Sequence, residues 1–434
     1  MEDLFKSNVM VIDYEWNSSV RLLDQHDKEY DLRLRDEMVL LRLINDSIDY
    51  FDAGNNEVVV SALSFRFLEH IYQNSNHMVA KIRERVPDYF IPEDSMAFVR
   101  KLATNVYKKP AADRYVIKTT LYEAYNYAVN NEYIKAKDLM LMSKITDTNN
   151  EGTLLMVYNR VLVQLAICAF RKGMIYEAKE ILDEICTQLK VKEMLGQTMP
   201  KTSVREDKRK LFPYHLHISF ETVESVYLMC VMLIEVPTIV SGEKELDKRN
   251  VNKMFQKLWN MYEKNEYNGP PENHKDYIYA ALKELAKGDW KTCFNYLSQL
   301  KCWLKMPDAE GIKQKILEIV KQQAFKSFIF AMKSSSHTLR FEHLKDIFEL
   351  PIEKLCSITC KMIRAKELKA RLDYETRSLI IGLNELTLLE GIGNTLTNKI
   401  TTVQTINEKL FDAKFVGAGI QDISATAELV QTKR

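Results

Sequence analysis

The chain has 434 residues, of which 61 are Lys or Arg and 60 are Asp or Glu, so its formal net charge is +1. This length suggests two or three domains, and the balanced charge argues against a protein that coats nucleic acid by electrostatics alone. Its 13 Gly and 10 Pro are about 5% of the chain, against about 12% in an average protein, which predicts an all-α fold. Seven scattered cysteines without a secretory signal indicate reduced thiols in a cytoplasmic protein. No apolar run reaches the roughly 18 residues of a membrane span, so no membrane partner is expected.

Residues 1–57 are predicted to form an acidic N-terminal segment. Residues 2–57 include 14 acidic and 6 basic side chains, a net charge of −8, and the remainder of the chain carries the opposite excess. Such asymmetry favours two faces with different partners. One helix is expected over 31–51, where apolar side chains recur near one face: Leu34, Met38, Leu41 and Ile48.

Residues 58–304 are predicted to form a helical-repeat arm. Three hairpins share a turn residue, an apolar residue two positions later and a small residue five positions later. They are Asn131/Tyr133/Ala136, Gly173/Ile175/Ala178 and Gly288/Trp290/Cys293. The turn residue suits a left-handed helix cap, and the small residue lets two helices approach closely. Stacked hairpins of this kind predict a tetratricopeptide-like solenoid with Trp290 buried between two helices.

Residues 305–383 are predicted to end in a winged helix. Helical spacing of apolar residues runs over 313–332, 341–348 and 352–365, and Pro351 suits the start of the last helix. The period then changes to two over 368–372, a polar turn follows, and 378–381 can return as a partner strand. We expect this return strand to present an open edge for another subunit, with Leu379, Ile380 and Ile381 at the interface.

Five cations lie close together at the end of the second winged-helix helix and in the first wing strand: Lys361, Arg364, Lys366, Lys369 and Arg371. Winged helices can contact nucleic-acid phosphates at this position, so these residues are candidates for RNA contact. The alternative is a solvated basic edge with no ligand.

Residues 384–434 are predicted to form a C-terminal packing helix and a tail. Apolar residues alternate at spacings of three and four in a coiled-coil-like seam: Leu386, Leu389, Leu396, Ile400, Val403 and Leu410. Such a seam needs a facing helix, which favours a subunit interface. The alternative is that the seam folds back on the upstream arm.

The sequence predicts no enzyme, metal site or cofactor. His215 and His217 have metal-like spacing, but Glu221 is the nearest further ligand type, so a structural role is expected. Cys356 and Cys360 share one helix face, and two thiols alone do not make a zinc site. The Gly-X-Gly stretches at 391–393 and 417–419 lack the context of a phosphate-binding loop.

Hairpins followed by a winged helix resemble a PCI domain, and five segments resemble the c subunit of eukaryotic translation initiation factor three. These segments are AKDLMLMS (136–143), YNRVLVQLAICAFRKGM (158–174), PYHLHISFETVESVYLMCVMLIEVP (213–237), GPPENHKDYIYAALKELAKGDWKTC (269–293) and FELPIEKLCSITCKMIRAKELKARLD (348–373). The resemblance implies a non-catalytic scaffold that joins other subunits, especially the PCI-containing a subunit, and binds the small ribosomal subunit and its RNA.

Family members usually carry a long charged N-terminal extension that binds other initiation factors. Much of it is expected to be missing here, so such contacts would depend on the acidic segment. Two alternatives remain at this point: a scaffold subunit of the proteasome lid or COP9 signalosome, and a winged-helix regulator that binds nucleic acid.

Overall fold

The computed structural model describes residues 2–24, 26–54, 56–85, 91–109, 113–143, 152–186, 191–198, 211–241, 255, 259–260, 270–333, 335–381 and 388–415. The chain divides into two compact units, residues 1–332 and 333–434. The long helix expected over 313–332 thus lies in the first compact unit, and the winged helix lies in the second. The acidic segment 1–57 also belongs to the first unit, because its helices pack on the helix that follows them.

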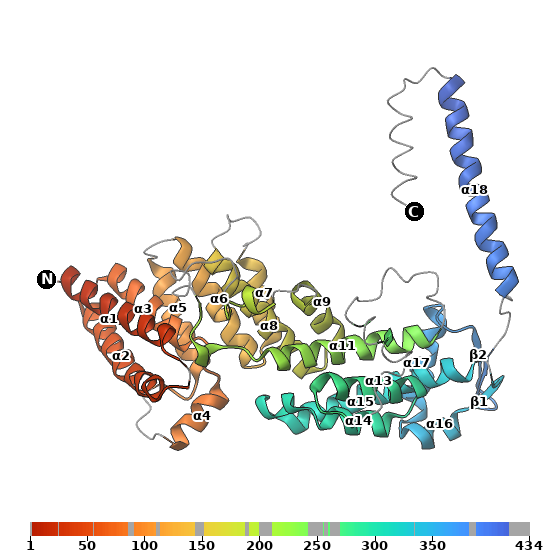
Figure 1. Ribbon diagram of the computed structural model, residues 1–434, viewed down its shortest axis with the longest axis horizontal. Coiled ribbons are helices and arrows are strands. Elements are labelled where there is room, and N and C mark those ends of the chain that lie inside the picture. The colour runs from red at the N-terminus through yellow and green to blue at the C-terminus, as the bar shows by residue number, and fades with distance from the viewer. Residues whose placement is uncertain are drawn as a thin grey trace. The chain divides into compact units, whose positions relative to one another are not determined.

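The first unit is helical throughout its described residues, apart from turns and connecting segments. Its elements are α1 (Glu2–Leu22), α2 (Lys28–Ala53), α3 (Glu57–Ile71), α4 (Asn76–Arg85), α5 (Ser95–Lys108), α6 (Asp113–Val129), α7 (Tyr133–Met142), α8 (Gly152–Lys172), α9 (Ile175–Cys186), α10 (Val191–Met194), η3 (Tyr214–Leu216), α11 (Phe220–Val240), α13 (His274–Lys287), α14 (Trp290–Ser298), η5 (Lys301–Lys305) and α15 (Ala309–Met332). Figure 1 shows α1 and α2 at one end of this unit, beside α3 and then α5.

The three predicted hairpins are confirmed as α6/α7, α8/α9 and α13/α14. Their turn residues Asn131, Gly173 and Gly288 have φ values of 69°, 88° and 88°, so each is left-handed. In each turn the backbone N–H of the next residue donates to the carbonyl five positions back: Glu132 to Tyr127, Met174 to Ala169, and Asp289 to Glu284. This bond satisfies a carbonyl at the end of the first helix and fixes the chain reversal.

The positions that follow each turn are also buried as predicted. The apolar residue is Tyr133, Ile175 or Trp290, and the small residue, which is Ala136, Ala178 or Cys293, is fully buried. The Trp290 ring lies against Lys321 of α15, whose Nζ is 4.2 Å from the ring centroid. A side chain larger than alanine or cysteine at the small position would separate the paired helices.

Two helices of the first unit are long and strongly apolar. By length and composition, Gly152–Lys172 and Tyr214–Val240 could each cross a membrane, which corrects the statement that no segment could. However, 67% and 78% of their apolar windows are buried within the protein. Core helices of a soluble fold have this character, because a helix covered on most sides has little need of polar residues.

The second unit begins with a winged helix. Its elements are β1 (Thr338–Arg340), α16 (Phe341–Phe348), α17 (Ile352–Arg364), β2 (Ala370–Asp373) and β3 (Ser378–Ile381). The helices and the β2/β3 hairpin were predicted, whereas β1 was not. Phe341, Leu344, Leu355 and Met362 are buried in the winged helix, whereas Ile347 is 46% exposed.

The strand β3 is the centre of its sheet, which corrects the prediction of an open edge there. The strand order is β1-β3-β2, with both neighbours antiparallel to β3. Leu379 and Ile381 are buried, and the backbone of Ile380 pairs with Thr338 on one side and Arg371 on the other. The short strand β1 therefore takes the hydrogen-bonding positions that were expected to face another chain.

The helix α18 (Leu388–Phe415) follows the winged helix (Figure 1). Leu396, Ile400 and Val403 of the predicted seam are 56–59% exposed, and Leu410 is partly buried. Leu386 lies outside the described residues, as does the side chain of Leu389. The described part of the seam is thus an apolar stripe open to solvent.

Candidate functional sites

The five predicted cations of the winged helix are all exposed. Lys361 and Arg364 lie in the last turn of α17, and Lys366 follows with a left-handed backbone at φ 60°. Lys369 and Arg371 project from the solvent side of the strand that continues the wing, because they alternate with the inward residues. None forms an ion pair within 4 Å with another described residue. The fold therefore presents these positive charges on one winged-helix edge.

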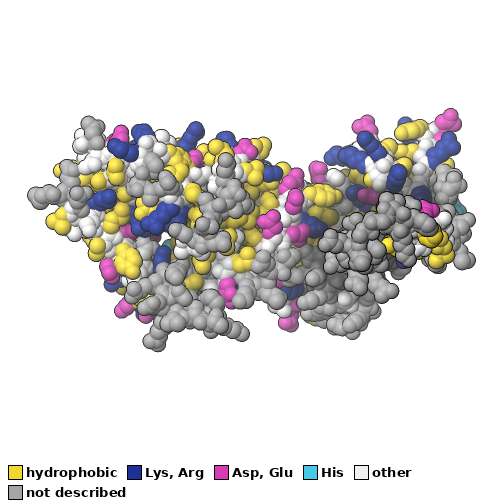
Figure 2. Space-filling model, turned by 90° about the horizontal axis from the view of Figure 1, so that it is seen from above, with side chains coloured by type: hydrophobic (Ala, Val, Ile, Leu, Met, Phe, Trp, Pro, Cys, Tyr) yellow, Lys and Arg dark blue, Asp and Glu magenta, His cyan; other side chains and the backbone are white. Residues whose placement is uncertain are grey.

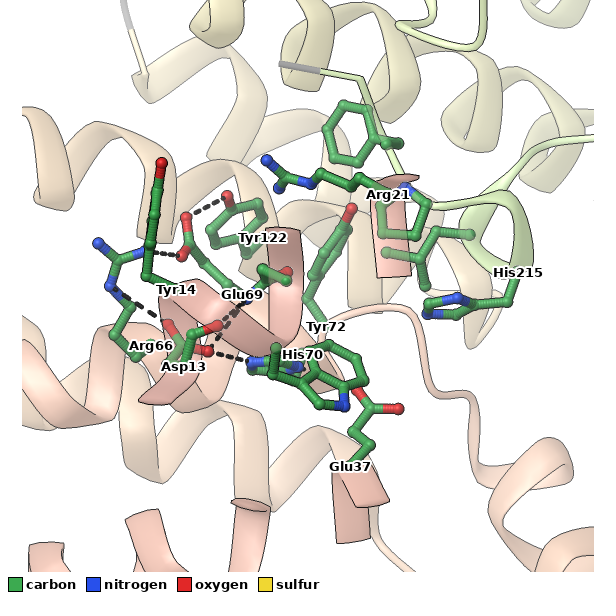
Figure 3. A pocket seen from close by; sticks show the side chains of 15 residues that line it. Asp13, Tyr14, Arg21, Glu37, Arg66, Glu69, His70, Tyr72, Tyr122 and His215 are labelled. Carbon is green, nitrogen blue, oxygen red and sulfur yellow. Dashed lines mark hydrogen bonds and ion pairs between the residues drawn. The ribbon is translucent and has the colours of Figure 1, made fainter. Parts of the chain in front are cut away.

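A second site, which the sequence analysis did not predict, is a buried ionic cluster in the first unit (Figure 3). His70 of α3 lies between Asp13 of α1 and Glu37 of α2. Its Nε2 is 2.8 Å from Asp13 Oδ1, and its Nδ1 is 2.9 Å from Glu37 Oε1. The side chains of His70 and Asp13 are only 5% and 3% exposed. The cluster thus joins three helices through one imidazole ring.

The two carboxylates set the charge of this ring. Burial by itself lowers the pKa of His70, but the hydrogen bonds and charges of Asp13 and Glu37 outweigh it and raise that pKa to about 10. The ring is therefore a cation at neutral pH, with both nitrogens donating. Trp16 covers it, with a ring-centroid distance of 5.2 Å.

Further charged groups extend the cluster around a cavity of about 150 Å³. Arg66 Nε lies 3.8 Å from Asp13 Oδ2, and Arg66 Nη1 lies 2.8 Å from Glu69 Oε2. The Tyr122 hydroxyl donates to the other oxygen of Glu69 at 3.3 Å. Burial raises the pKa of Tyr122, and the Glu69 charge raises it further, so this hydroxyl stays a donor.

The charges in this cavity are matched to one another. Asp13 accepts hydrogen bonds from His70 and from the Asn17 side-chain amide, the latter at 3.0 Å, and it forms an ion pair with Arg66. Among the described residues that line the cavity there is no serine or cysteine to act as a nucleophile beside the histidine. A protonated histidine held by two carboxylates cannot accept a further proton. The charged His70 therefore crosslinks helices and does not itself act as a general base.

The candidate metal residues have structural contacts. The Tyr30 hydroxyl lies 2.9 Å from His215 Nδ1 and accepts from the His215 backbone N–H at 3.0 Å. His217 Nε2 lies 3.0 Å from the Phe212 carbonyl oxygen. Burial lowers the pKa of both histidines, which favours neutral rings. These bonds tie the segment before α11 to α2 and to itself, as a structural role for the pair would require.

A stack of helical hairpins together with a winged helix defines a scaffold of the PCI class. Residues 297–382 match the PCI domain family, which spans the end of the first unit and the winged helix. Residues 6–246 match the family described as the N-terminus of eukaryotic translation initiation factor 3 subunit 8. The chain belongs to the family formed by the c subunits of eukaryotic translation initiation factor 3.

Curated relatives support this assignment over almost the whole chain. The c subunit of eukaryotic translation initiation factor 3 from Yarrowia lipolytica is 30% identical over 425 residues, covering 92% of this chain and 51% of the relative. The proteins of the same name from Xenopus tropicalis and Schizosaccharomyces pombe are 30% and 29% identical, each covering 93% of this chain and 46% of the relative. The chain therefore spans about half the length of the curated relatives it matches. These relatives favour the initiation-factor interpretation over a lid or signalosome subunit and over a nucleic-acid-binding regulator.

Proposed function

We propose that this chain is a non-catalytic scaffold subunit of eukaryotic translation initiation factor 3 in the cytoplasm. In this role it joins other subunits, binds the small ribosomal subunit and helps to assemble the preinitiation complex. The observation that carries the proposal is the continuous match of the helical arm and the winged helix to c-subunit relatives. Affinity purification of the tagged chain from cytoplasm tests it: initiation factor subunits and small-subunit proteins should co-purify, and their absence would refute it.

Contact with ribosomal RNA is proposed for the basic edge formed by Lys361, Arg364, Lys366, Lys369 and Arg371. The support is their common exposure on the end of α17 and the adjoining wing strand. Phosphate binding releases counterions, so the removal of each cation that binds a phosphate should reduce the slope of log affinity against log salt by about 0.7 to 0.9. If the edge is solvated and does not bind RNA, removal of these cations would leave the slope unchanged.

A charge-reversal variant tests this contact. Replacement of Lys361, Arg364, Lys369 and Arg371 by Glu should weaken binding to the small ribosomal subunit and flatten its salt dependence. A matched control reverses four exposed lysines of the helical arm: Lys101, Lys108, Lys135 and Lys137. Equal losses in the two variants would indicate a general charge effect, and unchanged binding of the first would restore the solvated-edge interpretation.

The exposed stripe on α18 is proposed to pack against a helix of another subunit, such as the PCI-containing a subunit. Leu396, Ile400 and Val403 lie within one helical sector, and more than half of each is open to solvent. Each buried side chain of this size contributes about 1.5 to 3 kcal/mol. The stripe therefore has enough apolar surface to stabilise a helical bundle.

Serine substitutions on the two sides of α18 test this interface. Leu396→Ser, Ile400→Ser and Val403→Ser together should abolish co-purification with the other subunits while the free chain stays folded. Asn398→Ser, Thr402→Ser and Thr405→Ser on the opposite face provide the control. If the first variant unfolds early when expressed alone, the stripe packs within this chain and the interface proposal fails.

A further inference from the structure

The helix α2 has apolar residues on two opposite faces. One face is buried against the protein and includes Ile44, Ile48 and Phe51. The other carries Leu32, Val39, Leu43 and Tyr50, which are 58%, 70%, 36% and 67% exposed. At about 100° per residue, their spacings of seven, four and seven place all four within a sector of about 40°. This outer stripe is straight and runs about 27 Å along the helix.

The neighbouring helix α1 repeats the pattern. Val9, Trp16 and Val20 face inward and are buried, whereas Leu4, Val11 and Leu22 lie on the opposite side and are 55–64% exposed. The two helices pack against each other. Figure 2 shows hydrophobic side chains open to solvent among charged ones over the N-terminal helices, at the left of the view. Two neighbouring helices at the N-terminal end of the unit thus both have apolar outer faces.

These outer faces lie where the helical stack would continue. Each hairpin of a solenoid buries a face on its neighbour, and a terminal hairpin that faces water has a polar outer side. The outer side of α1 and α2 is apolar instead. A straight stripe parallel to the axis of α2 suits another helix lying alongside it better than an irregular segment. Contiguous exposed apolar surface of this kind marks an interaction site.

The charge around the stripe indicates which charged side chains the partner helix should have. Among residues 4–53, nine carboxylates but only four Lys or Arg side chains are exposed. Directly beside the stripe the charges are mixed. Asp36 and Asp46 lie about 40° from its centre, and Lys28, Arg35 and Arg42 lie about 40° to 80° from it on the Asp46 side. We propose that the outer face of α1 and α2 is a docking surface for an amphipathic helix of another protein, with an apolar stripe flanked by Lys and Arg. The net negative charge of the region as a whole would favour this partner and disfavour acidic helices.

Binding of defined peptides to the full chain tests whether this surface prefers a basic amphipathic helix, and it needs no native partner. The probe is a fluorescent 18-residue peptide of Leu and Lys with Leu at helical spacing, and the comparison peptide has Glu in place of Lys. The Lys peptide should bind at least tenfold more tightly. Equal affinities, or tighter binding of the Glu peptide, would overturn the proposal.

Paired substitutions locate the binding. Val39→Lys with Tyr50→Lys should weaken binding of the Lys peptide at least tenfold. Ile134→Lys with Leu141→Lys should leave it unchanged, although these α7 residues are as exposed, at 70% and 69%. All four side chains are mainly solvent-exposed, so both variants should have the melting temperature of the wild-type chain. Equal loss in both variants, or no loss in the first, would show that the peptide does not bind at this surface.

A photo-reactive residue placed at position 39 identifies the native partner in initiation complexes. This measurement rests on the proposed function, whereas the peptide measurement does not. The photo-reactive residue should cross-link to a helical segment of another protein with basic residues beside its apolar stripe, and the same residue at position 134 should not. Cross-links to RNA, to a second copy of this chain, to another part of the same chain or to an acidic segment would overturn the proposal. So would no cross-link at position 39 in intact complexes.

Discussion

Replacing His70 by glutamine removes a buried cation from between two carboxylates and keeps a side chain of similar size. Asp13 and Glu37 then lose their common partner, and Arg66, at 3.8 Å, remains beside Asp13. Breaking a buried ion pair from one side costs about 3 to 5 kcal/mol, because the remaining charge stays buried. We therefore expect the packing of α1 and α2 on α3 to weaken by this amount.

The pKa shift gives an independent magnitude and a pH signature. The pKa of His70 is raised from 6.5 to about 10 in the folded chain, so its proton stabilises the fold fully below about pH 6.5. This contribution is lost as the pH rises towards 10. At about 1.36 kcal/mol per pH unit, the contribution is about 4 kcal/mol at pH 7 and about 1 kcal/mol at pH 9. The difference between wild type and His70→Gln should shrink accordingly.

Hydrogen exchange measures this effect locally, which matters because a chain of this size need not unfold in one step. Amides of α1 and α3 should lose protection in His70→Gln at pH 7, and those of α13 and α14 should not. His77→Gln provides the control, since His77 is exposed in the same unit and lies outside the cluster. A variant effect that is the same at pH 7 and pH 9, after correction for intrinsic exchange, would refute a charged His70.

Three further substitutions test the packing of the first unit. Trp290→Ala should destabilise it by about 3 to 5 kcal/mol, and a melting temperature within a degree or two of wild type would contradict the repeat alignment. Gly288→Ala should lower the free energy of unfolding by more than 1 kcal/mol in denaturant titrations, because the residue has φ +88° and a Cβ would lie 3.0 Å from Phe328 Cβ. An unchanged free energy of unfolding would show that the turn relaxes to accept alanine. Tyr30→Phe removes the hydroxyl that contacts His215 and should reduce local stability by about 0.5 to 1.5 kcal/mol. Amide hydrogen exchange in the N-terminal half of α2 should then be faster, and unchanged exchange would contradict this link.

Local sequence determined the hairpins and most of the winged helix. Asn131, Gly173 and Gly288 could be recognised because a left-handed cap selects residue types at one position, independently of distant contacts. The change of period at Leu368 likewise marked the wing strand, since alternation of side chains is a property of the backbone itself. The exposed basic edge also followed from the sequence, because Lys and Arg on such elements remain in water.

Tertiary structure decided which strand is central and which charges are buried. The strand β1 has three residues, too few for a periodic pattern, yet its pairing turns β3 from an edge into the centre. His70 lies 57 residues from Asp13 and 33 from Glu37, so no local spacing indicated their contact. For the same reason the sequence could show that α2 carries apolar residues, but not which of them would be covered. Burial depends on which helices meet, and that is fixed by packing across the whole unit.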